Sequence, residues 1–240
     1  MRCCIDHIAV TAPTLESGAE FVREALGVSP QPGGEHPRMG THNMLLRLGE
    51  TVYLQVSAPN PNAERPVRPR WFGLDTLRPD SAPGLGAWVA RTEYIHAAST
   101  AASERLGEVE AMTRGSLEWH ITISADGSLA LGGLAPSLIQ WKAGEPHPAG
   151  RLEDRGLSLV RLELFHPEPE RVSRLLHSLE FEGPVSVEEA RSGEAPTHVS
   201  GRRPTSSTRS IAATRVVIDT VQASRMLAAP RPLQPRSPPA

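Results

Sequence analysis

The sequence predicts an α+β protein of paired βαβββ modules, which form a curved mixed β-sheet with helices outside. Three observations favour this fold class. A strand, an amphipathic helix and a hairpin follow one another near the N-terminus, the same order restarts near residue 84, and a partial copy begins near residue 155. A supersecondary unit that recurs along a chain is typical of duplicated modules. The predicted boundaries are 1–60 for the first module, 61–83 for a linker, 84–145 for the second module, 155–190 for a partial third βα module, and 191–240 for a low-order tail rich in Pro, Ser and Arg.

The first module opens with a strand over residues 5–10, in which side chains alternate between the two faces of a sheet. Ile5, His7 and Ala9 are expected on one face, and the residues between them on the other. Thr14 then provides an N-cap for a helix whose apolar residues recur on one side. If this is right, His7 faces the concave side of the sheet.

A hairpin is predicted next, with strands over residues 41–48 and 51–57 joined by the pair Gly49-Glu50. A glycine at the first loop position suits a tight type II′ turn. A two-residue loop fixes the register, because each residue before the loop then faces a defined residue after it. The residues that this register places on one common face are His42, Met44, Tyr53 and Gln55. We expect that face to be the concave one.

The linker carries the aromatic run 70–75, in which Trp71 is expected either to cover the core or to act as a lid over a pocket. In the second module, strands are predicted over residues 85–90, 109–113, 117–124 and 137–141, with a helix after the first of them. The partial third module has a strand over residues 159–165 and a helix that Pro167 opens. Beyond residue 190 only residues 211–221 favour a strand.

Composition excludes several classes of partner. The net charge is -2, with 25 Lys and Arg against 27 Asp and Glu and no long basic run, so we expect no nucleic acid as partner. No apolar run approaches the roughly 18 residues of a membrane span, and the first strand leaves no room for a signal peptide. Cys3 and Cys4 are adjacent, which disfavours a disulfide between them. A reduced, cytoplasmic protein is the prediction.

The segment Ile5-Asp6-His7-Ile8-Ala9-Val10, at the head of two βαβββ units, resembles the vicinal oxygen chelate superfamily, which includes glyoxalase I, extradiol dioxygenases and bleomycin-resistance proteins. The run over residues 33–43, followed by the hairpin and by Arg70-Trp71-Phe72-Gly73-Leu74-Asp75, is similar to the glyoxalase-like domain proteins. The likeness covers roughly residues 4–190. It is specific for fold and family, and it does not identify a substrate.

The resemblance implies where a divalent metal would bind, because metal-using members place ligands on the first and last strand of each module. The matching positions here are His7, Gln55, Ala87 and Gln140. Of these only His7 is a strong metal ligand, since amide oxygens bring no charge to a partly dry site. A divalent metal is therefore only weakly supported, with His7 as its one candidate ligand.

The predicted function is a glyoxalase-like enzyme with lyase, isomerase or dioxygenase chemistry on a small molecule held on the concave face. His7 and His42 are the candidate catalytic groups, because an imidazole exchanges protons near pH 6–7. The candidate substrate-binding residues are Arg38, Tyr53, Gln55, Trp71 and Gln140. Two other interpretations stay open: a metal-free protein that sequesters a small molecule, as bleomycin-resistance proteins do, and an interaction scaffold. Either a homodimer or a monomer fits, since both modules occur in one chain.

Overall fold

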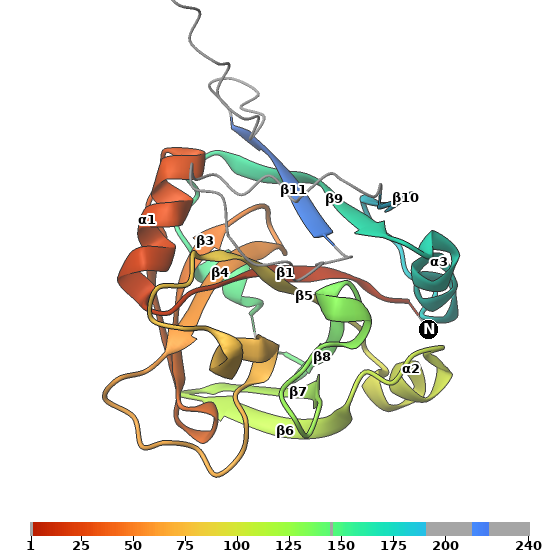
Figure 1. Cartoon of the computed structure of the whole chain (residues 1–240), viewed down its shortest axis with the longest axis horizontal. Helices are drawn as coiled ribbons and strands as arrows, with labels where there is room; N and C mark the ends of the chain where they lie inside the picture. The colour runs from red at the N-terminus through yellow and green to blue at the C-terminus, as the bar shows by residue number, and fades with distance from the viewer. Residues whose placement is uncertain (1, 145, 191–212, 221–240) are drawn as a thin grey trace, which may run out of the picture.

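Within residues 2–144, 146–190 and 213–220, which this computed structural model describes, two βαβββ modules join in one eight-stranded mixed sheet of order β2-β3-β4-β1-β5-β8-β7-β6 (Figure 1). The first module comprises β1 (Cys4–Thr11), α1 (Leu15–Leu26), β2 (Gln31–His36), β3 (Thr41–Arg47) and β4 (Tyr53–Pro59). The second comprises β5 (Gly84–Arg91), α2 (Ile95–Ala101), β6 (Glu108–Arg114), β7 (Leu117–Ile123) and β8 (Ser137–Trp141). Strands β1 and β5 pair antiparallel at the centre. The predicted fold class is confirmed.

Helix α1 begins where the sequence predicts, directly after Thr14. The Thr14 hydroxyl oxygen accepts a hydrogen bond from the Ser17 N–H at 3.1 Å, which satisfies one of the free donors at the helix start. Gly27 closes the helix in the left-handed conformation, with φ 74°, and its N–H donates to the Arg23 carbonyl. The buried side of α1, which includes Val22 and Leu26, packs against the sheet.

Strand β1 contains a β-bulge at Asp6 that the alternation of the sequence did not reveal. Ile5 pairs with Ala90 and His7 pairs with Val89, so Asp6 is an extra residue in β1 relative to β5. One extra residue reverses the alternation from that point on. Ile5 therefore lies in the core under the helices, and the prediction that it shares the face of His7 is wrong.

The β3–β4 hairpin has a register one residue away from the predicted one. The Leu48 N–H donates to the Val52 carbonyl at 2.9 Å, so the loop has three residues rather than two. Leu45 consequently pairs with Gln55, and His42 pairs with Ala58. A slip of one residue turns every side chain of a strand to the other face. Asn43, and not His42, shares the concave face with Gln55.

A third unit packs on the side of the main sheet that carries the helices. It consists of β9 (Leu157–His166), α3 (Pro169–Ser178), β10 (Val185–Glu189) and β11 (Ala213–Thr220), and its described strands form a sheet of order β10-β9-β11. Val216 and Ile218 of β11 are buried in the same core as Leu162 of β9 and Val22 of α1. The predicted low-order tail thus contains a strand, within the range 211–221 that the sequence favoured. The rest of that tail lies outside the described residues.

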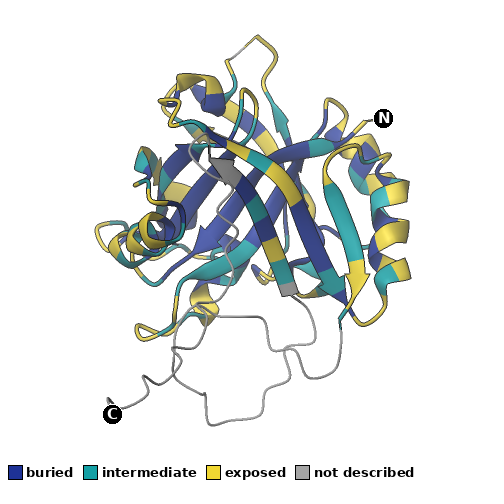
Figure 2. Cartoon of the chain, turned by 90° about the horizontal axis from the view of Figure 1, so that it is seen from above, coloured by how far each residue is buried: buried dark blue, intermediate teal, exposed yellow. Residues whose placement is uncertain are grey.

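The main sheet therefore has two different faces. Its convex face packs against the helices and the third unit, and its concave face encloses a second apolar cluster that includes Ala9, Trp71 and Trp119. Buried residues gather on the central strands of the main sheet, while exposed residues follow the outer faces of the helices (Figure 2). Among the described helices, none is both long enough and apolar enough to cross a membrane.

Candidate functional site

The concave face encloses a cavity whose walls come from both modules. Most of the wall is aromatic or aliphatic, and a polar patch interrupts it. The aromatic and aliphatic residues are Tyr53, Trp71, Phe72, Trp119, Ile121, Ile139 and Trp141, and the polar ones are His7, His36, Asn43, Gln55 and Arg114. The free volume is about 20 Å³, which is room for about one water molecule. A larger ligand must therefore displace part of the wall. A second hollow, behind Trp71 and Phe72, has no titratable side chain in its lining.

His7, which lines this cavity, forms a hydrogen-bonded pair with Asp6. The Asp6 side chain is fully buried, and its Oδ1 atom lies 2.6 Å from Nδ1 of His7. Its other oxygen, Oδ2, accepts from Nε1 of Trp141 at 2.8 Å and from Nε2 of His147 at 3.0 Å. The bulge in β1 is what turns Asp6 toward these three donors. The His7 ring also stacks on Tyr53, with 4.6 Å between ring centroids.

The hydrogen bonds define which atoms of Asp6, His7 and His147 carry a proton. Burial alone raises the pKa of Asp6, but the hydrogen bonds from His147 and His7 outweigh it and hold that pKa well below its usual value. An ionised carboxylate only accepts, so Nδ1 of His7 carries a proton and Nε2 is left as the acceptor. His147 has its proton on Nε2, because its Nδ1 accepts the Ala149 N–H at 3.2 Å. The buried Asp6 anion therefore orients the His7 ring and holds its proton on Nδ1.

Sequence reasoning missed Asp6 and His147. The sequence contained one signal, since an aspartate inside an otherwise apolar strand must have a partner when buried. The alternation, however, placed Asp6 on the face away from His7, and only the bulge corrects this. His147 lies in the connection to the third unit, 141 residues away from Asp6 along the chain.

The other polar residues of the patch form a second network, which spans the two modules. Nδ2 of Asn43 donates to Oε1 of Gln55 at 3.1 Å. Oδ1 of Asn43 accepts from Nη1 of Arg114, the last residue of β6, at 3.2 Å and from the Gly34 N–H at 2.9 Å. The same Nη1 atom of Arg114 lies 3.3 Å from Nε2 of His36. Burial, together with the Arg114 charge, lowers the pKa of His36 to about 3.

The pair Gly33-Gly34 makes room for this network. A Cβ atom on Gly33 would lie 2.1 Å from Oδ1 of Asn43, and one on Gly34 would lie 2.8 Å from Cδ of Arg114. Any larger residue would displace the amide or the guanidinium group. The two glycines thus let the edge strand β2 lie close to side chains of β3 and β6.

The structure brings three of the predicted substrate-binding residues together and separates the others. Tyr53, Gln55 and Trp71 all line the cavity beside His7. His42 lies on the helix-side face, where its Nε2 atom is buried without a hydrogen-bond partner among the described residues. The prediction that it shares the cavity with His7 is wrong, because the hairpin loop is one residue longer than expected.

Gln140 and Arg38 are also placed differently. Oε1 of Gln140 accepts the Ile95 N–H at 2.9 Å, at the start of α2, so this side chain lies on the helix side. Its neighbours Ile139 and Trp141 reach the cavity instead. The position that was matched to Gln55 of the first module is therefore one residue away from the position in β8 that faces the cavity. Arg38 forms an ion pair with Glu110 of β6 and does not line the cavity.

The residues present do not fit a divalent metal. Of the four positions that the resemblance implied, His7 is the only imidazole, Ala87 has no donor, and Gln140 lies outside the cavity. No group of three His, Cys, Asp or Glu side chains in the described part of the chain is arranged to hold a metal ion. Arg114 also brings a positive charge to the same cavity, which opposes a cation there.

Comparison with known proteins identifies relatives at the level of family and fold. A family model described as a glyoxalase-like domain matches residues 5–180. No curated protein matches the chain. A hypothetical protein from Staphylococcus aureus has a TM-score of 0.52 and 16% identity over 75% of each chain, which shows a shared fold alone.

Two methylmalonyl-CoA epimerases are more distant in structure. The Streptomyces coelicolor protein, a variant in complex with 2-nitronate-propionyl-CoA, has a TM-score of 0.40 and 19% identity over 59% of this chain and 96% of that one. The Mycobacterium tuberculosis protein has a TM-score of 0.37 and 16% identity over 59% and 88%. These scores are too low to support an argument about activity.

Proposed function

Because the chain belongs to the glyoxalase-like domain family, we propose that its cavity catalyses metal-independent proton transfer on a small carbonyl compound. The observation that carries this proposal is the hydrogen bond of 2.6 Å between the buried Asp6 carboxylate and Nδ1 of His7. A carboxylate in this position fixes the tautomer of the imidazole and stabilises the cation that forms when the imidazole takes a proton.

In the proposed step, Nε2 of His7 removes a proton from the carbon atom next to the carbonyl group. The C–H electron pair moves to the carbonyl oxygen, which gives an enolate and a protonated His7 paired with Asp6. Return of the proton to another atom of the enolate completes an isomerisation, and return to the same carbon after the protonated His7 has exchanged its proton with solvent completes a hydrogen exchange. The substrate gives up one proton and takes one back, so the step needs no co-reactant other than water.

Tyr53 can stabilise the enolate oxygen. Burial raises the pKa of its hydroxyl group well above the usual value, and the charge of Asp6 raises it further. The phenol therefore keeps its proton and can donate it in a hydrogen bond. Gln55 lies beside it in the cavity wall and offers an amide group for positioning the substrate.

Hydrogen exchange from solvent tests this function directly. Small aromatic ketones and 2-oxo acids are incubated with the protein in D2O, and deuterium incorporation next to the carbonyl is followed by NMR against the spontaneous rate. We expect His7→Gln to lose about 10²- to 10⁴-fold of the enzymatic rate, which is typical of removing a general base. Asp6→Asn is expected to lose at least about 10-fold, because His7 then loses its oriented tautomer.

His42→Gln is the matched control, since it removes an imidazole on the opposite face of the sheet. Its exchange rate is expected to equal that of the wild type. Exchange that His7→Gln leaves unchanged, or that His42→Gln abolishes, contradicts the proposal.

A second candidate function is metal-free binding of an aromatic compound. It is favoured by the wall of the cavity, where three tryptophans, Trp71, Trp119 and Trp141, surround a small polar patch. Quenching of tryptophan fluorescence by aromatic ligands, with no deuterium incorporation into any of them, would support this function in place of catalysis.

A further inference from the structure

The geometry points to Arg114 as the residue that binds a carboxylate group of the ligand, and so to aromatic carboxylic acids as the ligand class. This inference rests on the proposed function in one respect, which is that the same cavity receives the ligand. It adds the chemical class of that ligand and a specificity residue from the second module.

The Arg114 guanidinium lines the cavity without a counter-charge. Its hydrogen-bond partners are Oδ1 of Asn43 at 3.2 Å and Nε2 of His36 at 3.3 Å, and both are neutral groups. No ion pair involves Arg114 within the described ranges. Asp6, the buried carboxylate of the same cavity region, already accepts bonds from three other side chains. A guanidinium has five N–H donors, so most of those of Arg114 remain for a ligand.

The neighbouring arginines differ from Arg114 in this respect. Arg68 binds Glu110 through contacts of 2.5 and 2.7 Å. Arg70 binds Asp75, with 2.6 Å between Nη1 and Oδ1. Arg68 and Arg70 are thus each paired with a carboxylate, whereas Arg114 is not. A planar anion with two oxygen atoms matches the fork of its N–H groups.

The groups around Arg114 neither neutralise its positive charge nor add a second one. His36 is held neutral by burial and by the arginine itself, so it accepts a hydrogen bond and does not repel the guanidinium. Gly34 leaves the space that the aliphatic part of Arg114 occupies. Trp71, whose ring centroid is 5.0 Å from that of His36, has an indole N–H that is buried without an acceptor among the described residues. A ligand oxygen can satisfy this donor as well.

The rest of the wall indicates an aromatic body for the ligand. Trp119 and Trp141 lie 5.5 Å apart between ring centroids, and Tyr53 stacks on His7. Flat apolar groups gain most from such surfaces. An arylcarboxylic or arylalkyl-carboxylic acid therefore matches the chemistry of both parts of the wall, and it must displace part of that wall because the free volume is only about 20 Å³.

Binding of matched ligands tests this inference. The probes are benzoate, phenylacetate and phenylpyruvate, the neutral benzamide and phenylacetamide, and the cation benzamidinium. Their binding is followed by tryptophan fluorescence, because three of the four tryptophans of the chain line the cavity. We expect at least one carboxylate to bind about 10-fold or more tightly than its amide, as is typical of a charged hydrogen bond, and benzamidinium to bind most weakly.

The variants assign the preference to Arg114. In Arg114→Gln the carboxylate is expected to lose its advantage over the amide while the amide binds as before, and Arg114→Lys is expected to restore part of the advantage. Arg78→Gln is the control for charge, because Arg78 is exposed and pairs with Asp80. Thermal melting shows whether each variant is folded, and the amide serves as an internal control in each of them. Equal affinity for acid and amide in the wild type, no binding of any carboxylate, or a preference that survives in Arg114→Gln overturns the inference.

The His7→Gln variant separates this inference from the proposed function. It is expected to keep the carboxylate preference although it has lost proton exchange. A carboxylate preference in a protein that exchanges no proton would contradict the proposed function and leave Arg114 as an anion site. Exchange on neutral ketones without any carboxylate preference would contradict the inference and leave the proposed function in place.

Discussion

Nε2 of His36, in β2 of the first module, lies 3.3 Å from Nη1 of Arg114, in β6 of the second. Since arginine always donates, Nε2 of His36 must accept, and the imidazole is neutral. Protonation of His36 would place two positive charges in contact at the point where the modules meet. The free energy of unfolding therefore depends on whether His36 is protonated.

The protein is expected to lose stability as the pH falls from about 6.5, and His36 is one cause. Burial and Arg114 lower the pKa of His36 to about 3, whereas an unfolded histidine titrates near 6.5. Between these values the unfolded chain binds a proton that the folded chain does not bind. The free energy of unfolding then decreases by up to about 1.4 kcal/mol per pH unit because of this residue.

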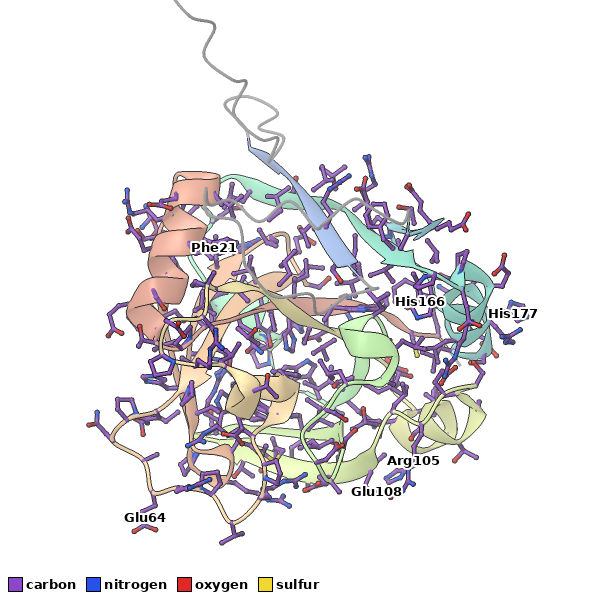
Figure 3. All side chains as sticks on the ribbon, in the orientation of Figure 1. Phe21, Glu64, Arg105, Glu108, His166 and His177 are labelled. Carbon is purple, nitrogen blue, oxygen red and sulfur yellow. The ribbon has the colours of Figure 1, made fainter. Side chains whose placement is uncertain are left out.

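His36→Gln removes the titrating group and keeps an acceptor for Arg114. Urea unfolding at pH 7, 6, 5 and 4 is expected to give a shallower decrease for this variant than for the wild type. His177→Gln serves as control, since His177 lies on the exposed side of α3 (Figure 3). An equal slope in the wild type and His36→Gln would show that His36 is not buried as a neutral group.

The contact between the outer strands of the main sheet depends on Glu110 of β6. Its carboxylate binds Arg68 of the linker and Arg38, which follows β2, and its side chain is only 17% exposed. Glu110→Gln leaves both guanidinium groups without their counter-charge. We expect the free energy of unfolding to decrease by about 1–3 kcal/mol, which is typical of losing a hydrogen bond to a charged group.

Glu108→Gln, two residues earlier on the same strand, is the matched control. Glu108 pairs with Arg105, and both side chains are exposed at the edge of the molecule (Figure 3). Exposed pairs contribute about 0–1 kcal/mol. If both variants lost the same stability, the ion pairs of Glu110 would not hold the two edges together.

Strand β11 is expected to be part of the core. Ile218 is 5% exposed and packs in the cluster shared by the main sheet and the third unit. Ile218→Ala should lower the free energy of unfolding by about 2–5 kcal/mol. Val217→Ala, at the neighbouring half-buried position, should cost less than about 1.5 kcal/mol. Chemical denaturation measures the free energy of unfolding of both variants. Similar losses would contradict the arrangement in which Ile218 faces the core and Val217 does not.

The sequence by itself determined the local elements and their order. Thr14 and Gly27 define the ends of α1 through hydrogen bonds within a few residues, and the second copy of the same element order defined the paired modules. The strand position of His7 was enough to predict that it faces the concave side. These features depend on contacts that are close along the chain, so a pattern of residues can reveal them.

Tertiary structure alone decided which side chains join His7. The bulge at Asp6 exists only in the pairing of β1 with β5, and the three-residue hairpin loop exchanges His42 for Asn43 on the concave face. Arg114 enters the cavity because the curled sheet brings β6 close to β2. The register of β6 against β7, in which Met112 pairs with Trp119 and Arg114 pairs with Leu117, also belongs to the tertiary structure. The physical reason is the period of two in a strand: one residue more or less, set by a distant partner, reverses which side chains meet the ligand.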